Sequence, residues 1–311
     1  MSKVAFIFPG QGAQYTGMGR DFYENFNRAK EVFAIAGKVS GMSMEELIFK
    51  KDERLDVTKY TQVAMLTVEL AILKVLEEKG VTSFVNAGLS LGEYAALVAS
   101  GGLSVHDALE LVVKRGALMQ EAVPTGGAMM AIMGLDSSVV ESACEKTEGI
   151  VSIANYNCPG QIVISGEEKA VAAAASKLKE DGAKRCIPLN VSGPFHSKML
   201  EGAGEQLAAE LEKIEIGELT TPYISNVTAE YVMEKEEVKE LLKRQVSSSV
   251  RWQQSVELMV SEGVDTFIEI GPKKTLSSFL KKIAPQMRSY HVETVEDMEE
   301  LLETLKGDGK P

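Results

Sequence analysis

Short apolar runs alternate with longer amphipathic stretches along the first hundred residues. Residues 4–8 form an apolar run that proline and glycine stop, which predicts a buried strand followed by a loop. Apolar residues recur at helical spacing between positions 20 and 79, so we expect several helices there. A second apolar run at 84–88 leads directly into a helical pattern at 93–99, which two glycines end. A strand, a tight turn and a helix are therefore expected in succession around position 90.

The same alternation returns after residue 194. Strands alternating with helices predict an α/β fold whose mainly parallel sheet is covered on both faces. The short tail at 307–311 is expected to be frayed. Helical patterns lie at 197–213, 234–260, 275–283 and 295–305, and apolar runs that predict strands lie at 223–226, 265–270 and 288–292.

The stretch between these two parts has an order of its own. Its apolar runs and helical patterns follow the sequence β-α-β-β-α-β, which is that of a ferredoxin-like module. Glycine and proline mark both of its ends. We therefore expect a small domain at residues 126–193 that interrupts a large domain formed by residues 1–125 and 194–311. The runs lie at 128–133, 151–154, 161–165 and 185–189, and the helical patterns at 137–146 and 168–180.

Composition narrows the classes of function. With 33 Lys and Arg against 45 Asp and Glu, the net charge is −12, so we expect no nucleic-acid partner. No apolar run reaches the roughly 18 residues that span a bilayer, and the first run is too short for a signal peptide, so we expect no membrane partner. The three cysteines are widely spaced and form no Cys-x-x-Cys, which indicates a reducing cytoplasmic location and no metal site.

Residues 88–92 read Gly-Leu-Ser-Leu-Gly and match the nucleophile-elbow pattern Gly-x-Ser-x-Gly. Such a turn needs small residues on both flanks, and it presents the Ser90 hydroxyl at the start of the following helix. The helix N-terminus and the backbone N–H of Leu91 then lie where negative charge would develop. The position between a strand and a helix favours a nucleophile over a plain turn serine.

A serine nucleophile needs a general base, and the chain has three histidines, His106, His196 and His291. His106 lies near the start of a helical pattern and is expected on the surface. His196 lies in the loop that returns from the inserted module. His291 follows a late strand, where a hydrolase would place its base, with Asp265 or Glu269 as the acid. Spacing alone leaves the choice between His196 and His291 open.

Two other positions have both a structural and a chemical interpretation. The glycines around Gln11 fit a dinucleotide loop poorly, because Tyr15 occupies the third glycine position. They could instead bring the backbone N–H of Gln11 close to the nucleophile. Arg115 lies in a helical pattern with apolar neighbours, where it could form a structural ion pair or clamp a substrate carboxylate.

Seven sequence blocks stand out along the chain: GQGAQ at 10–14, GLSLGEY at 88–94, Arg115, NYNCPGQ at 155–161, GPFHS at 193–197, a segment from Gln245 to Trp252, and EIGP at 269–272. In this order they resemble the malonyl-CoA:acyl-carrier-protein transacylases. The resemblance covers residues 4 to about 292, and it implies an α/β-hydrolase-like large domain interrupted by a ferredoxin-like small one. This agrees with the module inferred from the pattern.

The resemblance implies a role for individual residues. Ser90 would be the nucleophile and His196 its base, with the backbone carbonyl of Gln245 orienting the histidine in place of an acid. Gln11 and Leu91 would supply oxyanion-hole N–H groups.

Further residues are implied to bind the acyl group. Arg115 would pair with the malonyl carboxylate, and Phe195 matches the form of its motif that selects malonyl over branched groups. Asn155 and Asn157 fall in a motif that lines the family's cleft, although such residues equally often form turns.

The implied reaction moves a malonyl group from malonyl-CoA to the phosphopantetheine thiol of acyl carrier protein through a malonyl-serine. We expect a monomer with no tightly bound cofactor. A free-standing acyltransferase of a polyketide synthase would share every catalytic residue. A serine esterase or thioesterase using His291, and a non-catalytic acyl-binding module, are the alternatives of other classes.

The chain departs from the family pattern at Leu89, where histidine is common, and at Ser249, where proline is common. The second change is expected to leave the loop after Gln245 less rigid.

Acyl carrier proteins are acidic, so docking requires a local basic patch. The candidates are the pairs at 243–244, 273–274 and 281–282.

Overall fold

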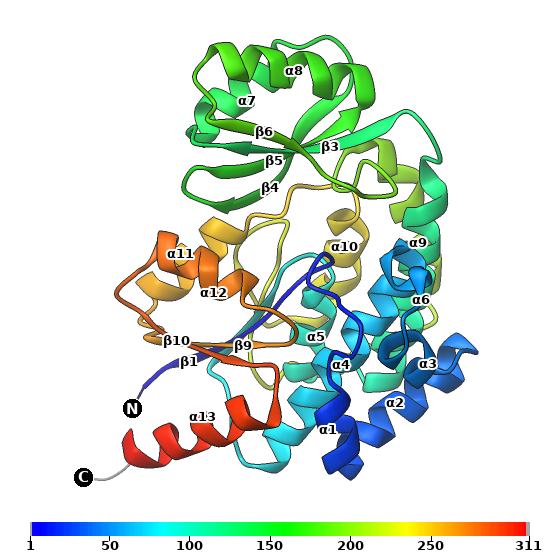
Figure 1. Ribbon diagram of the computed structural model, residues 1–311, viewed down its shortest axis with the longest axis vertical. Coiled ribbons are helices and arrows are strands. Elements are labelled where there is room, and N and C mark those ends of the chain that lie inside the picture. Colours follow the sequence, from blue (N-terminus) through cyan, green and yellow to red (C-terminus); the bar gives the residue numbers. More distant parts are fainter. Residues whose placement is uncertain (1, 309–311) are drawn as a thin grey trace.

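The computed structural model describes residues 2–308, which fold around two separate sheets (Figure 1). The larger sheet has the order β10-β9-β1-β2-β7-β8, and every pair of neighbours is parallel except β7 and β8. The expected α/β fold with a mainly parallel sheet is confirmed. The strands are β1 (Val4–Phe8), β2 (Val85–Gly88), β7 (Tyr223–Ile224), β8 (Tyr231–Val232), β9 (Thr266–Ile270) and β10 (Arg288–Val292).

Helices cover both faces of this sheet. Successive side chains of a strand point to opposite faces, and β1 shows the consequence: Phe6 and Phe8 join one apolar cluster, and Ala5 and Ile7 join another. The helices outside the inserted module are α1 (Arg20–Asn25), α2 (Asn27–Ser40), α3 (Met44–Phe49), α4 (Thr58–Glu78), α5 (Gly92–Ala99), α6 (Val105–Ala122), α9 (Glu201–Leu211), α10 (Lys235–Gln245), α11 (Trp252–Ser261), α12 (Thr275–Ile283) and α13 (Val295–Asp308).

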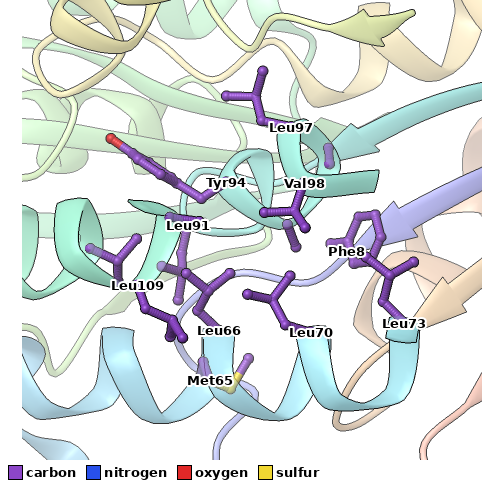
Figure 2. Close-up of a cluster of buried hydrophobic side chains, with 14 of the residues drawn as sticks. Phe8, Met65, Leu66, Leu70, Leu73, Leu91, Tyr94, Leu97, Val98 and Leu109 are labelled. Atoms are coloured by element: carbon purple, nitrogen blue, oxygen red, sulfur yellow. The ribbon is translucent and has the colours of Figure 1, made fainter. Parts of the chain in front are cut away.

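The first cluster packs α4 and α5 against the sheet. Figure 2 shows Leu66, Leu70 and Leu73 of α4 facing α5, with Phe8 of β1 lying beside them. All four side chains are fully buried. The second cluster joins α11 and α12 to the opposite face. Helix α5 is therefore fixed on the sheet directly after the turn that contains Ser90.

The smaller sheet is antiparallel with the order β4-β5-β3-β6, and α7 and α8 lie above it in Figure 1. This is the expected ferredoxin-like arrangement. One apolar cluster lies wholly within the module, which supports our proposal that residues 126–193 form a domain apart from 1–125 and 194–311. The elements are β3 (Gly127–Met133), α7 (Ser137–Glu145), β4 (Val151–Cys158), β5 (Gln161–Glu167), α8 (Glu168–Glu180) and β6 (Arg185–Pro188).

Several boundaries differ from the sequence-based expectations. Strand β4 continues to Cys158 through two register shifts, so Asn155 and Asn157 belong to a strand and the turn interpretation is wrong for both. The helix expected from residue 197 begins as a short 3-10 turn at Lys198–Leu200. Helix α13 extends to Asp308, so the fraying predicted from residue 307 is wrong for residues 307 and 308, and the rest of that prediction lies outside the described range. Within residues 2–308, no helix is long and apolar enough to cross a membrane.

Candidate active site

Ser90 lies in the sharp turn between β2 and α5. Its φ is 55°, a left-handed conformation that is rare for a residue with a side chain. Both neighbouring glycines are required by close backbone approach. A Cβ on Gly88 would lie 1.9 Å from the carbonyl carbon of Gly92, and one on Gly92 would lie 2.2 Å from the Phe8 carbonyl oxygen. The turn therefore has the geometry that the Gly-x-Ser-x-Gly pattern predicts.

Asn226 holds this turn from the outside. Its Oδ1 accepts a hydrogen bond from the backbone N–H of Ser90 at 2.6 Å, and its Nδ2 donates to the carbonyl of Gly88 at 2.6 Å. Asn226 is itself buried, two residues after β7. One amide side chain thus satisfies a donor and an acceptor of the strained turn, and it limits how far Ser90 can move.

The structure brings His196 to Ser90. The Ser90 Oγ lies 2.7 Å from His196 Nε2, and His196 Nδ1 lies 2.9 Å from the carbonyl oxygen of Gln245 and 3.1 Å from that of Ser248. The Nδ1–H donates to these carbonyls, which leaves the Nε2 lone pair to accept the serine proton. No carboxylate within residues 2–308 bonds to the imidazole.

Burial sets the protonation state of this histidine. Desolvation, and next the positive charge of Arg115, lower the pKa of His196 to about 4, although its two backbone hydrogen bonds act in the opposite direction. The imidazole is therefore neutral near pH 7. A neutral imidazole next to a serine hydroxyl can act as a general base.

The other two histidines lie elsewhere. His291 is on β10, three strands or about 14 Å from β2, and its Nε2 bonds to the carbonyl of Gly271 at 2.9 Å. Glu269 accepts from the N–H groups of Leu276 and Ser277 instead of orienting a histidine toward Ser90. His106 is exposed at the start of α6, as expected. The geometry thus selects His196 from the alternatives that spacing left open.

Arg115 is buried in α6 and points at the nucleophile. One guanidinium nitrogen, Nη2, donates to Ser90 Oγ at 3.1 Å and to Gln245 Oε1 at 3.0 Å, and Nη1 donates to Gln62 Oε1 at 2.8 Å. Burial lowers its pKa. Among the described residues, no carboxylate lies within 4.0 Å of it, so it forms no structural ion pair. A buried cation without a carboxylate partner favours binding of an anion beside Ser90.

The loop after β1 brings Gln11 to the same place. Its side chain donates to Thr58 Oγ1 at 3.0 Å, which anchors the loop to the first turn of α4. In the part of the chain that the structure describes, neither the backbone N–H of Gln11 nor that of Leu91 donates to another protein group. Both remain available for an oxyanion.

These groups line a cavity of about 110 Å³ with two unlike sides. Ser90, His196, Arg115 and Gln62 form what we name the polar wall. Asn155 also reaches the cavity, whereas Asn157 is not among its lining residues and is buried in the same strand. The apolar wall consists of Met119, Met129, Leu189, Val191 and Phe195.

Comparison with known proteins identifies the family. The model of the acyl transferase domain family matches residues 5–306. The malonyl CoA-acyl carrier protein transacylase of Bacillus subtilis is 47% identical in an alignment of 311 positions that covers 98% of this chain and 98% of that protein. The chain belongs to the malonyl CoA-acyl carrier protein transacylase family.

Solved structures of malonyl CoA-acyl carrier protein transacylases are similar over almost the whole chain. The enzyme of Clostridium perfringens superposes with a TM-score of 0.94 at 46% identity and covers 98% of both chains. A malonyl-transacylase in complex with a type II polyketide synthase acyl-carrier protein gives a TM-score of 0.94 at 40% identity, over 97% of this chain and all of that one. These likenesses confirm the family that the sequence blocks indicated.

The two departures from the malonyl-transacylase pattern have different surroundings. Leu89 lines the cavity with an apolar side chain and adds no polar group to it. Ser249 donates to the carbonyl of Ile153 at 2.5 Å, and the next residue, Val250, donates to that of Ala154 at 2.7 Å. Strand β4 therefore anchors the loop after Gln245, although the fixed proline conformation is absent.

The sequence blocks of the transacylase family left four residues of this site without a role. Gln62, Glu93 and Asn226 bond to site residues through their side chains, and Ser248 does so through its carbonyl. A signal existed for Gln62, a polar residue on the buried face of a long apolar helix. Glu93 directly follows the nucleophile motif, and Asn226 is the last residue of the strand predicted at 223–226, which in the structure pairs with β2.

Proposed function

We propose that this chain transfers a malonyl group from malonyl-CoA to the phosphopantetheine thiol of an acyl carrier protein, through a malonyl ester on Ser90. One observation carries the proposal: the buried guanidinium of Arg115, without a carboxylate partner, donates to the hydroxyl of a serine that also bonds a neutral histidine. That arrangement fits an acyl group with a free carboxylate two bonds from the reacting carbonyl.

The first half-reaction forms the ester. As Ser90 Oγ attacks the thioester carbonyl, His196 Nε2 takes its proton, and the carbonyls of Gln245 and Ser248 stabilise the resulting imidazolium through Nδ1–H. The N–H groups of Gln11 and Leu91 hold the oxyanion. The C–S bond then breaks, and CoA leaves as the thiol with the proton from His196.

The second half-reaction reverses these roles. His196 takes the proton of the phosphopantetheine thiol, whose sulfur attacks the malonyl ester. The C–O bond to Ser90 breaks, and His196 returns the proton to Ser90 Oγ. A double displacement of this kind gives ping-pong kinetics.

Selection of the acyl group follows from the two walls of the cavity. Arg115 binds the malonyl carboxylate, for which a planar guanidinium offers two parallel N–H donors. The apolar wall excludes water that would hydrolyse the ester, and Phe195 fills the space that an α-methyl branch would need. Asn155 lies at the cavity edge as a further contact to the acyl chain.

The carrier protein would dock on one of the basic pairs that the sequence offers. Lys273 donates to the carbonyl of Gly12, next to the loop that carries Gln11, and Lys281 and Lys282 lie on the last turn of α12. Lys243 is paired with Glu205 and is the weaker candidate. Charge reversal of Lys281 and Lys282 should raise the KM for carrier protein and leave that for malonyl-CoA unchanged. An unchanged KM for the carrier would reject this surface.

The same proposal covers the oligomeric state, the cofactors, the cellular location and the carrier. The site is assembled from one chain, which supports a monomer. No resident cofactor takes part, because malonyl-CoA and the carrier's phosphopantetheine are substrates. The cysteines are all free, which supports a cytoplasmic location. The carrier belongs either to fatty acid synthesis or to a polyketide synthase, as in the solved complex.

Mass spectrometry of the intact protein tests the proposal. Incubation with malonyl-CoA should add one malonyl group on Ser90, and addition of holo acyl carrier protein should remove it to the carrier. The Ser90→Ala variant should gain nothing. Release of free malonate instead of malonyl-carrier would support a thioesterase, and an adduct on the Ser90→Ala variant would place the nucleophile elsewhere.

A further inference from the structure

Glu93 is a wholly buried carboxylate directly behind the nucleophile, in the first turn of α5. One of its oxygens, Oε2, accepts from the side-chain Nε2 of Gln245 at 2.6 Å and from the backbone N–H of Asn226 at 3.1 Å. The two donors belong to α10 and to the segment after β7. A single oxygen atom thus joins three segments that lie far apart in the sequence.

Both donors hold parts of the site. Asn226 bonds the turn of Ser90 as described above. The backbone carbonyl of Gln245 bonds His196. The side chain of Gln245 makes further contacts, since its Oε1 accepts from Arg115 at 3.0 Å and its Nε2 also donates to the Ser90 carbonyl at 2.9 Å. The amide of Gln245 therefore lies between the carboxylate of Glu93 and the guanidinium of Arg115.

The orientation of this amide depends on what its nitrogen can donate to. If the amide of Gln245 turned over, its oxygen would face two acceptors, Glu93 Oε2 and the Ser90 carbonyl, and its NH₂ would face the donor Nη2 of Arg115. All three contacts would become repulsive. The acceptor of Glu93 consequently keeps the Gln245 oxygen aimed at Arg115.

The carboxylate can take up a proton without losing these contacts. Its second oxygen, Oε1, has no hydrogen-bond partner among the described residues. Burial raises the pKa of Glu93 to about 7, and the bonds from Gln245 and Asn226 and the charge of Arg115 limit the rise. A proton on Oε1 would leave Oε2 as the acceptor for Gln245.

We propose that Glu93 is a positioning residue for malonyl selection: by fixing the amide of Gln245, it holds the Arg115 guanidinium in line with the malonyl carboxylate beside Ser90. This inference rests on the proposed function, because it explains what orients the Arg115 guanidinium toward the malonyl carboxylate. Glu93 touches neither the substrate nor the reacting atoms.

The test compares the acylation of Ser90 by malonyl-CoA and by acetyl-CoA in the full-length protein. The readout is the ratio of the two kcat/KM values, which does not depend on the fraction of molecules that fold. Glu93→Leu removes the acceptor at similar volume and should lower the malonyl-to-acetyl ratio about tenfold or more, the size expected when a hydrogen bond to a charged group is lost. Glu93→Gln can present its own amide oxygen to Gln245 and should keep the ratio within about twofold.

Two further variants make the result decisive. Glu93→Asp keeps the charge but retracts the acceptor, and it should lower the ratio even if Glu93→Leu does not fold. Glu69→Leu is the matched control, because Glu69 is also a fully buried glutamate but neither of its oxygens bonds a described residue, and its loss should leave the ratio unchanged.

The outcomes separate the inference from the function on which it rests. A wild-type protein that forms no malonyl ester on Ser90 overturns the proposed function. A wild-type protein that forms the ester, together with Leu and Asp variants of Glu93 that keep the wild-type ratio, overturns the positioning role alone.

Discussion

The two walls of the cavity are held in place by different forces. On the polar wall, Ser90, His196 and Arg115 each make two or more hydrogen bonds to other protein groups, and several partners are themselves buried. On the apolar wall, side chains such as Met129 and Phe195 are fixed by packing alone. Hydrogen bonds set angles and proton positions, whereas packing sets volume. We therefore expect the polar wall to set the reactivity and to bind the malonyl carboxylate, and the apolar wall to limit the size of the acyl group.

The largest effect should follow from loss of the base on the polar wall. Replacing His196 by Ala should slow the malonylation of Ser90 by about 10²- to 10⁴-fold, because no other group can take the serine proton. Quenched-flow mass spectrometry measures this rate. The His291→Ala variant is the control and should remain active. An inactive His291→Ala beside an active His196→Ala would support the esterase alternative.

A smaller loss should follow when the cation of the polar wall is removed. Arg115→Ala should reduce kcat/KM for malonyl-CoA by about 10- to 100-fold, because a hydrogen-bonded charge pair to the substrate carboxylate is lost. Acetyl-CoA has no such carboxylate, so its relative use should improve. Arg115→Lys keeps the charge but lacks the planar guanidinium, so its kcat/KM for malonyl-CoA should lie between those of the wild type and Arg115→Ala. Unchanged selectivity in Arg115→Ala would contradict the clamp.

A change on the apolar wall should alter selection while preserving the chemistry. Phe195→Ala enlarges the cavity where an α-methyl group would lie, so the ratio of methylmalonyl-CoA to malonyl-CoA use should rise about tenfold. The maximal rate with malonyl-CoA should change little. Val191→Ala, elsewhere on the same wall, is the comparison. A large loss of malonyl turnover with no change in selection would show that this wall supports catalysis.

The smallest expected effect is on the pH dependence between pH 5 and 8. The lowered pKa of His196, about 4, keeps the base neutral throughout this range, so kcat/KM for malonylation should not fall with a midpoint near 6.5. Its acid limb should lie close to pH 4. The profile is best measured in Glu93→Gln, which removes the carboxyl whose pKa burial raises to about 7. A midpoint near 6.5 in that variant would mean that the histidine is hydrated in solution.

Much of the fold follows from local patterns in the sequence. The continuous apolar run of β1, the helical spacing in α4 and the glycines around Ser90 each reflect neighbours in the chain, so they could be predicted. Strand β4 was predicted too short, because Asn155 and Asn157 are polar yet buried at register shifts. Polarity alone could not show that these residues lie in a sheet.

The site residues that no motif marks bond to residues far away in the sequence. Gln62 meets Arg115 across 53 positions, and Asn226 meets Ser90 across 136. No spacing rule connects residues so far apart, and a buried amide or carboxylate has no periodic signature. The reacting groups and Gln245 could therefore be inferred from motifs, whereas Gln62, Glu93 and Asn226 required the structure.

A crystal structure of the protein trapped with a malonyl group on Ser90 tests the account most directly. We predict that the ester carbonyl oxygen lies within hydrogen-bond distance of the N–H groups of Gln11 and Leu91, and that the free carboxylate accepts from the Arg115 guanidinium. A malonyl carboxylate that points along the apolar wall or into solvent, with Arg115 still bonded only to protein groups, would contradict the division of labour between the two walls.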